Sequence, residues 1–243
     1  MITAASNSRI KRLVQLNQKS KLRRTEDIFL AEGVKMFLEA PREQLQEVYV
    51  SESFLEKCSC REHLEEVGYE VVSDSVFSKI SDTCTPQGVL CVLKQFHYNI
   101  EEMLRDKAPL FLLLENIQDP GNLGTMLRTG EGAGVSGIIM SRDTVDLYNP
   151  KVIRSTMGSI YRVPFYYADD FAAAVHQVQQ AGVSVYAAHL RGKNSYACQD
   201  YTKGTAFLIG NEGNGLREET AELADCYIPV SYTHLTLPTN REV

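Results

Sequence analysis

Hydrophobic residues in the second half of the chain come in short runs that alternate with amphipathic stretches. Helical periodicity is clearest over Leu123–Glu131 and Phe171–Gln180. Five apolar runs have the length of buried strands: Leu110–Leu114, Gly137–Met140, Val183–Ala187, Phe207–Ile209 and Tyr227–Val230. Strands that alternate with helices predict an α/β fold with a mainly parallel sheet, whose ligand site lies at the carboxyl ends of the strands.

The first third of the chain shows shorter elements of both kinds. Asn7 or Ser8 can cap a first helix whose apolar side chains are Ile10, Leu13 and Val14. Further helices are expected from Gly33 to near Pro41 and around Arg61–Val67, and short strands over Ile28–Leu30, Val48–Val50, Glu70–Val72 and Gly88–Leu93. These elements predict a small α/β domain over residues 1–95. A linker over residues 96–108, with room for one helical turn, would separate it from a second domain over residues 109–230.

Composition narrows the class of protein. The chain has 243 residues, of which 44% are hydrophobic and 23% charged, as in soluble globular proteins. No apolar run is long enough for a membrane span, and the first residues do not resemble a secretory signal. The six cysteines are scattered, without a CxxC pair or a histidine cluster, so we expect reduced thiols in a cytoplasmic protein and no metal site.

Charge is unevenly distributed along the chain. The net charge is −6, yet residues 1–24 hold no acidic side chain. They hold seven basic ones: Arg9, Lys11, Arg12, Lys19, Lys21, Arg23 and Arg24. A basic arm on an acidic body is typical of proteins that contact nucleic acid. A solvated helix face that lacks carboxylates would show the same pattern.

A polar segment follows the strand predicted at Leu110–Leu114. Pro120 and Gly121 predict a turn, and a helix should begin near Asn122. Asn122 and Arg128 are six residues apart, which does not by itself place them on one helix face. Arg128 nevertheless follows a strand end where a ligand would bind. From chemistry alone, a surface arginine and a helix-capping asparagine are the alternatives.

A glycine-rich loop follows the strand predicted at Phe207–Ile209. Gly210, Gly213 and Gly215 lack a Cβ atom and would let backbone groups approach a flat ligand closely. The loop has no lysine, and Glu212 would repel a phosphate, so a neutral or cationic ligand fits better than a nucleoside triphosphate. A sulfonium cofactor meets this requirement. A plain strand-to-helix connection is the alternative.

One apparent nucleotide fingerprint is in the wrong context. Residues 132–137 match the GxGxxG pattern, but a helix is predicted before them and a strand after them. The dinucleotide motif requires the opposite order, because the pyrophosphate lies at the N-terminus of the following helix. We therefore interpret these glycines as a helix end and a turn, which disfavours a nicotinamide-dependent oxidoreductase.

Three segments in this order, DPGNLGTMLRT, IGNEGNGL and YIPV, closely resemble motifs of a known family. This is the SpoU (TrmH-like) branch of the SPOUT superfamily of RNA 2′-O-ribose methyltransferases. The front domain is similar to the family's ribosomal-protein-like RNA-binding module, and the resemblance covers residues 1–230. It implies a catalytic α/β domain with a deep trefoil knot, S-adenosylmethionine as methyl donor, and a homodimer with the active site near its interface.

The resemblance also implies roles for single residues. Arg128 matches the family's catalytic arginine, and Asn122 and Glu212 match its polar motif residues. The backbone groups that bind the cofactor are expected at Ile209, Gly210, Gly213, Gly215, Ile228 and Ala188. Because a guanidinium stays protonated in proteins, we expect Arg128 to stabilise the developing alkoxide, with the proton acceptor unidentified. The basic residues of the arm would bind RNA phosphates, and ribosomal RNA is a better expectation than transfer RNA.

The chain departs from the family pattern after Val230. The family has a Ser-Leu-Asn turn and a closing helix that passes through the knot, whereas this chain reads SYTHLTLPTNREV. Pro238 stands where that helix should run. We expect residues 231–243 to be a non-native tail, so that the chain as it stands binds S-adenosylmethionine poorly. An RNA-binding protein with a degenerate, catalytically impaired methyltransferase domain is therefore the alternative function.

Overall fold

The computed structural model describes residues 1–193 and 195–229, which fall into two compact units. Unit 1 comprises Met1–His97, Gln118–Ala133 and Val145–Val163. Unit 2 comprises Tyr98–Ile117, Gly134–Thr144 and the described residues from Pro164 onward. Neither unit is one continuous stretch of sequence.

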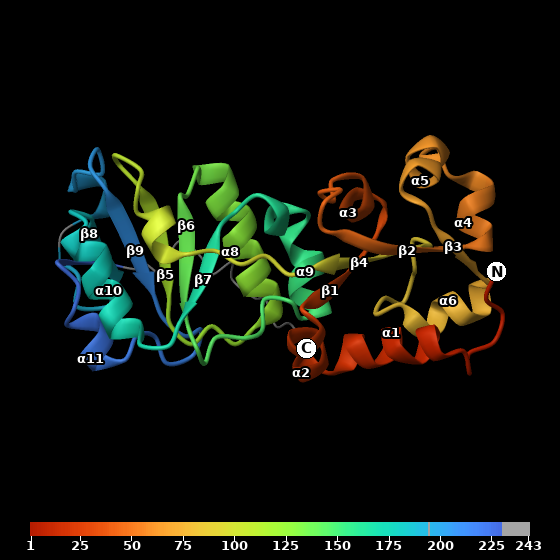
Figure 1. Ribbon diagram of the computed structural model, residues 1–243. Coiled ribbons are helices and arrows are strands. Elements are labelled where there is room, and N and C mark those ends of the chain that lie inside the picture. The colour runs from red at the N-terminus through yellow and green to blue at the C-terminus, as the bar shows by residue number, and fades with distance from the viewer. Residues whose placement is uncertain (194, 230–243) are drawn as a thin grey trace, which may run out of the picture. The chain divides into compact units, whose positions relative to one another are not determined.

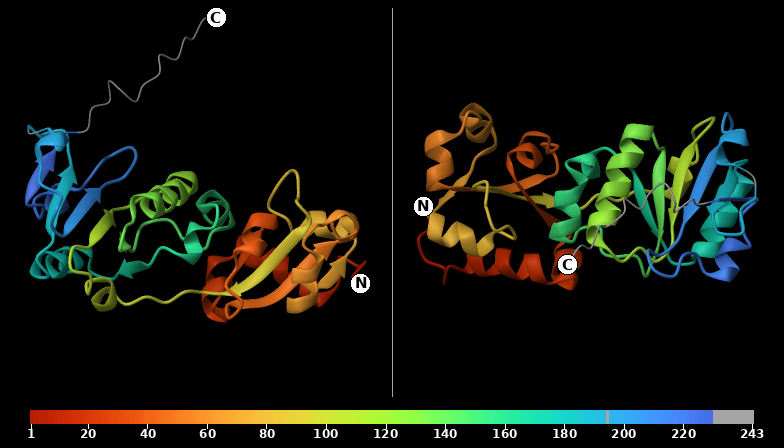
Figure 2. Two further views of the ribbon diagram at one scale, coloured as in Figure 1. Left: turned by 90° about the horizontal axis from the view of Figure 1, so that it is seen from above. Right: turned by 180° about the vertical axis from the view of Figure 1, so that it is seen from behind.

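Unit 1 contains a four-stranded sheet in the order β1-β4-β2-β3. Its strands are β1 (Ile28–Glu32), β2 (Leu45–Ser51), β3 (Glu70–Val72) and β4 (Val89–Lys94). β4 runs antiparallel to β1 and β2, and β3 runs parallel to β2. Helices α1 (Ser8–Gln18) and α6 (Asp74–Ile80) lie on one face, and α3 (Val34–Leu38), α4 (Glu52–Lys57) and α5 (Arg61–Val67) on the other (Figures 1 and 2). The prediction of a small α/β unit in the first third of the chain, which we call the front module, is confirmed.

The first helix forms for the reason that the sequence suggests. The Asn7 side chain accepts a hydrogen bond from the backbone N–H of Arg9 at 2.9 Å, so Asn7 is the helix cap. Ile10, Leu13 and Leu16 are buried and pack with α6 and the sheet. Val14 is partly buried and packs against the same cluster, as expected for a residue of the apolar stripe, and Leu16 extends that stripe.

Unit 1 also contains the helical elements α8 (Pro120–Ala133), α9 (Pro150–Thr156) and the short η1 (Ser159–Tyr161). α8 and α9 cross closely at Gly124, where a Cβ atom would lie 2.0 Å from the Ser155 Oγ. The Tyr161 hydroxyl donates to the Met36 carbonyl of α3 at 3.0 Å, and the ring of Tyr148 lies 4.9 Å from that of Phe29 on β1. These contacts tie α9 and its flanking residues to the front sheet. A short helix α2 (Ser20–Glu26) follows α1.

Unit 2 contains a six-stranded sheet in the order β10-β8-β9-β5-β6-β7, and every neighbouring pair is parallel. Its strands are β5 (Leu110–Leu114), β6 (Gly137–Ser141), β7 (Phe165–Ala168), β8 (Ser184–Ala188), β9 (Thr205–Ile209) and β10 (Cys226–Ile228). The predicted parallel sheet is confirmed. β10 lies at one edge of the sheet.

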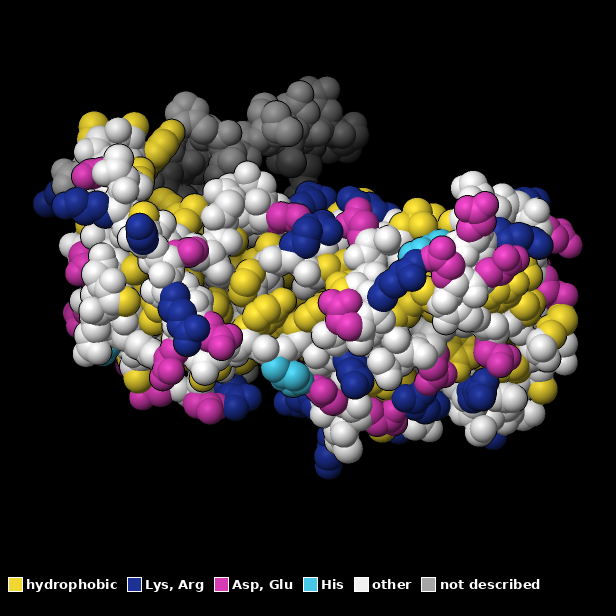
Figure 3. All heavy atoms as spheres, turned by 45° about the horizontal axis from the view of Figure 1, so that its top comes forward, with side chains coloured by type: hydrophobic (Ala, Val, Ile, Leu, Met, Phe, Trp, Pro, Cys, Tyr) yellow, Lys and Arg dark blue, Asp and Glu magenta, His cyan; other side chains and the backbone are white. Residues whose placement is uncertain are grey.

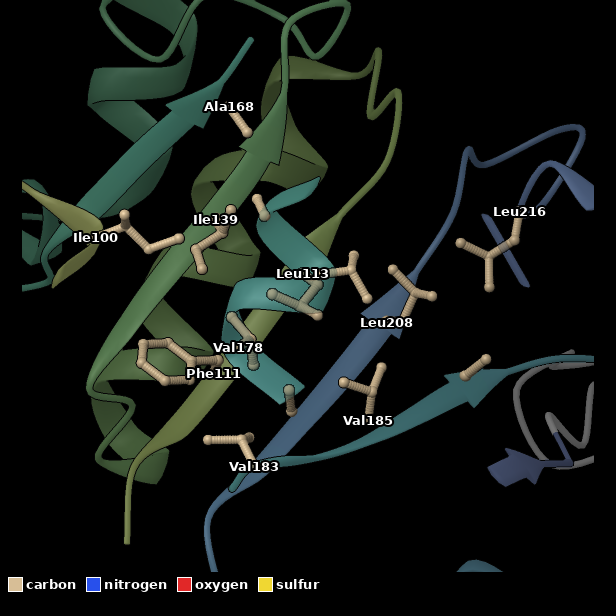
Figure 4. Packing of buried hydrophobic residues seen from close by; sticks show 14 of the residues in the cluster. Ile100, Phe111, Leu113, Ile139, Ala168, Val178, Val183, Val185, Leu208 and Leu216 are labelled. Atoms are coloured by element: carbon tan, nitrogen blue, oxygen red, sulfur yellow. The ribbon is translucent and has the colours of Figure 1, made fainter. Parts of the chain in front are cut away.

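Helix α10 (Phe171–Gln180) covers the centre of this sheet, and its Val178 packs with Phe111, Leu113 and Val185 from the strands (Figure 4). Its bounds agree with the prediction. Two shorter helices, α7 (Ile100–Met103) and α11 (Glu218–Ala221), and a 3-10 turn, η2 (Tyr196–Cys198), complete the unit. α7 is the single helical turn for which the predicted linker had room.

The order of elements around the GxGxxG match is confirmed. α8 ends at Ala133 and β6 begins at Gly137, so a helix precedes the glycines and a strand follows them. Gly134 has a φ of +74°, a backbone conformation that suits glycine at the end of a helix.

Several expectations fall on residues 194 and 230–243, outside the described part of the chain. They are Val230 as the end of the last strand, the non-native tail and the threading of a knot by the closing segment. The knot and the tail stay predictions. Among the described helices, none is both long and apolar enough to cross a membrane.

Candidate functional site

The candidate cofactor residues meet at the carboxyl ends of three neighbouring strands in unit 2. Ala188 at the end of β8 pairs with Ile228 at the end of β10. On the other side of β8, Ala187 pairs with Leu208, so Ile209 ends β9 beside Ala188. The chain then continues into Gly210. Residues up to forty positions apart in sequence are therefore brought to one edge of the sheet, as the parallel topology predicted.

Residues 210–216, which we call the glycine loop, fold back on themselves. The backbones of Asn211 and Gly215 exchange two hydrogen bonds, of 3.0 and 2.9 Å. The Asn211 side-chain oxygen also accepts from the N–H groups of Gly213 and Asn214, both at 3.0 Å. Leu216, at the end of the loop, is buried in the core of unit 2. The loop is thus a closed turn whose shape depends on Asn211.

Two of the glycines are required by the loop itself. A Cβ atom on Gly210 would lie 2.2 Å from the backbone nitrogen of Leu216, and Gly215 has a φ of +70°. At Gly213 a Cβ atom would meet only the Asn211 side-chain oxygen, at 3.6 Å. The sequence explanation, that missing Cβ atoms admit a ligand, is therefore incomplete: Gly210 and Gly215 first allow the backbone to turn on itself.

The carboxylate of Glu115 holds the end of the loop from outside. Glu115 follows β5 directly and its side chain is 1% exposed. It accepts from the N–H of Arg217 at 2.8 Å and from the Thr220 hydroxyl at 2.5 Å. Arg217 precedes α11 and makes no side-chain cap of its own. A carboxylate from another strand thus satisfies a free N–H group at the start of this helix.

The next residue, Asn116, holds the beginning of the loop. Its carbonyl oxygen accepts from the Asn211 side-chain amide at 2.8 Å, and its N–H donates to the Ser141 hydroxyl at 2.8 Å. Asn116 has a φ of +54°, which asparagine adopts more readily than most residues. We call Glu115 and Asn116 the clamp, because they bind both ends of the glycine loop. Sequence reasoning missed them; the signal was a carboxylate placed immediately after a fully apolar strand.

The network extends to Asp143. Ser141 donates to Asp143 at 2.5 Å, and the Arg217 guanidinium forms an ion pair with Asp143. Partial burial alone would raise the pKa of Asp143, but the hydrogen bonds from Ser141 and Arg217 outweigh it and lower that pKa. The same contact with Asp143 raises the pKa of Arg217. Both side chains are therefore charged at neutral pH.

A hollow of about 710 Å³ lies beside the clamp, at the carboxyl ends of β5, β6 and β7. Arg217 and Asp143 contribute to its wall, together with the carboxylates of Asp169, Asp170 and Glu219. This excess of carboxylates disfavours phosphate. Within residues 1–193 and 195–229, no group of three His, Cys, Asp or Glu side chains could hold a metal ion.

Arg128 and Asn122 lie on α8, in unit 1, whereas the glycine loop with Glu212 lies in unit 2. Both side chains are exposed. The helix begins at Pro120 rather than near Asn122, and the Asp119 side chain accepts from the Asn122 N–H at 2.8 Å. Asp119 therefore has the capping role considered for Asn122. Glu212 is exposed on the loop. The cofactor candidates and Glu212 share one unit, and the two α8 residues belong to the other.

The basic arm is partly neutralised by ion pairs. Arg12 pairs with Glu26 at 2.6 Å and Glu47 at 2.8 Å, and Arg9 with Glu70 at 3.2 Å. Lys11, Lys19, Lys21 and Arg24 are exposed. On the face in Figure 3, basic and acidic side chains are interspersed, without one continuous basic patch.

Arg23 does not fit the expected phosphate role. Its side chain is 2% exposed and donates to the Leu16 carbonyl at 2.6 Å and to Asp146 at 2.5 Å. A buried and paired guanidinium is not available to RNA, so this expectation is corrected. Arg23 instead ties α1 to the segment before α9. The sequence could not show this, because Asp146 lies 123 residues away.

Comparisons with known proteins agree with this architecture. The model of the SpoU rRNA Methylase family matches residues 109–235, and that of the MRM3-like substrate binding domain matches residues 7–91. The chain belongs to the SpoU rRNA methylase family. The resemblance drawn from the three motifs is confirmed, and the chain is an S-adenosylmethionine-dependent RNA methyltransferase by descent.

Individual relatives cover nearly the whole chain. The 23S rRNA (guanosine(2553)-2'-O)-methyltransferase RlmP of Bacillus subtilis is 31% identical over 234 residues, which cover 94% of this chain and 90% of that protein. An rRNA methyltransferase from Sinorhizobium meliloti has a similar structure, with a TM-score of 0.81, 29% identity and coverage of 95% and 89%. The structure of an AdoMet-bound rRNA methyltransferase from Sinorhizobium meliloti gives a TM-score of 0.79 at 27% identity, covering 100% of this chain and 91% of that one.

Glu115→Gln should destabilise the protein by about 2–3 kcal/mol. Both oxygens of the buried carboxylate accept hydrogen bonds, and the NH₂ group of glutamine would face one of these donors instead of accepting from it. Urea unfolding measures this change. Glu219→Gln is the matched control, because Glu219 is exposed on α11, the helix that Glu115 binds. It should change the free energy of unfolding by less than about 0.5 kcal/mol. Equal changes in the free energy of unfolding for the two variants would show that the clamp does not stabilise the fold.

The lowered pKa of Asp143 predicts a pH-dependent contribution. The ionised form is favoured in the folded protein, so its stabilisation is complete above the ordinary aspartate pKa and is lost as pH falls through the lowered folded value. The difference in unfolding free energy between the original protein and Asp143→Asn should therefore stay constant above about pH 5 and shrink as the pH falls from there toward about pH 2. A difference that grows on acidification contradicts the assignment.

Proposed function

We propose that this chain transfers the methyl group of S-adenosylmethionine to a ribose 2′-hydroxyl in ribosomal RNA. The observation that carries the proposal is the glycine loop, held at both ends by the clamp, at the carboxyl ends of β8, β9 and β10. Membership in the SpoU rRNA methylase family supports it, as does the ribose methylation in the name of the Bacillus subtilis relative.

The charge of the loop fits this cofactor. Residues 210–216 contain no basic side chain, and Glu212 is exposed there. A carboxylate suits a cationic sulfonium and disfavours a phosphate. Bound there, S-adenosylmethionine supplies an activated methyl group and leaves as a neutral thioether. We assign its backbone contacts to Ile209, Gly210, Gly213, Gly215, Ala188 and Ile228.

Arg128 is the residue that we propose for the reacting ribose. Its guanidinium stays protonated, so it stabilises negative charge that develops on the 2′-oxygen and binds the adjacent phosphate. Its side chain is exposed, so a phosphate or ribose can reach it. We assign Asn122 and Glu212 to orienting the ribose and the methyl donor. The proton acceptor stays unassigned.

The substrate follows from the front module. Exposed Lys11, Lys19, Lys21 and Arg24 supply attraction to phosphates, with Arg9 and Arg12 weakened by their ion pairs. Since this attraction is independent of sequence, the target nucleotide must be selected by RNA shape and unpaired bases. We propose that the substrate is ribosomal RNA rather than transfer RNA, and that the active form is a homodimer. We also propose that the protein acts in the cytoplasm, where its six free thiols stay reduced.

The segment after Val230 gives a direct comparison. A chimera that carries the ending of the Bacillus subtilis relative from position 231 should bind S-adenosylmethionine at least about tenfold more tightly than the chain as it stands. Calorimetric titration measures both dissociation constants. Equal values, with ordinary affinity for the chain as it stands, would show that the departure from the family pattern does not matter.

Arg128→Ala should reduce labelled-methyl transfer to ribosomal RNA by about 10²–10³ in the chimera, because a preorganised charge is lost at the reacting oxygen. The affinity for RNA should fall by no more than the loss of a single phosphate contact would cause. Arg105→Ala, a change of another arginine outside the proposed site, serves as the control. RNA binding without any transfer by the chimera itself would favour the alternative, an RNA-binding protein with an impaired catalytic domain.

A further inference from the structure

A small cavity in unit 1 lies outside the candidate site described above. It lies where the start of α3, the loop before β4 and the end of α9 meet, and its volume is about 240 Å³. Gly33, Lys35, Met36, Gln87, Arg154 and Met157 contribute to its wall. Complete small-molecule sites usually measure about 300–1,000 Å³, so this cavity suits one part of a larger ligand.

Two cations stand at this cavity with weak partners. Lys35 lies 3.7 Å from Glu39, and Arg154 lies 3.3 Å from Asp82; their side chains are 53% and 44% exposed. Arg162 also binds the Glu39 carboxylate, at 2.7 Å, so Lys35 is the more distant of the two cations that pair with Glu39. Exposed ion pairs of this kind contribute little to folding stability, so both cations can exchange their carboxylate partners for a phosphate.

Met157 is the unusual residue of the wall. It ends α9 with a φ of +53°, a left-handed conformation that glycine adopts more readily. Its side chain is nevertheless 44% exposed, so burial does not compensate for the strained backbone. A strained, exposed thioether at a cavity points to a ligand that it contacts. Met36, beside it in the wall, is buried and adds a second thioether.

The polar groups of the wall offer donors rather than negative charge. The Gln87 side-chain oxygen accepts from the Val34 N–H at 2.9 Å, and its amide nitrogen has no acceptor within the described residues. The one carboxylate, Glu32, already accepts from the hydroxyls of Ser81 at 2.7 Å and Thr83 at 3.0 Å. The cavity therefore combines apolar thioethers, a free amide donor and two exchangeable cations.

We propose that this cavity binds one unpaired nucleotide of an RNA single strand, its base against Met36 and Met157 and its flanking phosphates on Lys35 and Arg154. Thioethers make favourable contacts with aromatic rings, and single-stranded RNA is the form whose bases can enter a pocket. RNA is favoured over a peptide because most of the wall belongs to residues 7–91, the match to a substrate binding domain. The inference rests on the proposed function in that RNA is the substrate.

The test uses the full chain and fluorescein-labelled eight-nucleotide RNA homopolymers, with a duplex of equal length for comparison. Met157→Gly relieves the backbone strain and removes the thioether, so its melting temperature should equal or exceed the original. Its affinity for the single strands, measured by fluorescence anisotropy, should nevertheless fall roughly tenfold, with duplex affinity unchanged. Leu38→Ala, which shortens an exposed apolar side chain of α3 outside the cavity, should leave affinity as it was.

The cations give a second, independent measurement. Lys35→Gln and Arg154→Gln should each lower the salt dependence of single-strand binding by about 0.7 in log–log slope. Lys79→Gln, on α6 at the other face of the sheet, should lower it less. The proposal is overturned if Met157→Gly binds single strands as tightly as the original, or if the original binds no single strand. Failure of methyl transfer with these binding effects intact would overturn the proposed reaction alone.

Discussion

The carboxylate of Glu115 is the group on which the candidate site most depends. It is buried and follows the central strand β5 directly, and it accepts hydrogen bonds from the segment that follows the glycine loop. A buried carboxyl group without partners would be unfavourable, so these bonds are favoured whenever the sheet is intact. Asn116 fixes the other end of the loop through Asn211. The loop therefore takes its shape from the sheet before any ligand binds, which is the preorganisation that cofactor binding and catalysis need.

Burial and pairing also divide the basic residues of the front module into two groups. Arg23 is paired and buried, and it contributes to packing. Lys11, Lys19, Lys21 and Arg24 remain exposed and can attract a polyanion. The net charge of −6 is thus compatible with RNA binding, because accessible charge and not total charge determines attraction at a surface. Selection among RNA sequences requires contacts of another kind, to bases.

Local sequence patterns were sufficient for most of the fold. Apolar runs predicted five of the six strands of unit 2, and Phe171–Gln180 was predicted with its observed bounds. β7 was missed, since Phe165–Ala168 is short, half-buried and aromatic. Gly210 was recognised, but its reason, a backbone contact with Leu216, appears only in three dimensions. The clamp and the burial of Arg23 were not predictable, because their partners are about one hundred or more residues away and no local pattern encodes such pairs.

The central claim is that Glu115 and Asn116 order the glycine loop without a ligand. Backbone amide hydrogen exchange, followed by NMR at Gly213, Asn214, Gly215 and Arg217, tests it most directly. The account predicts exchange slowed well below unstructured-peptide rates at all four amides, and loss of that protection at Arg217 when Glu115 is replaced. Exchange at unstructured rates in the original protein, with the loop open until a cofactor is added, would contradict it.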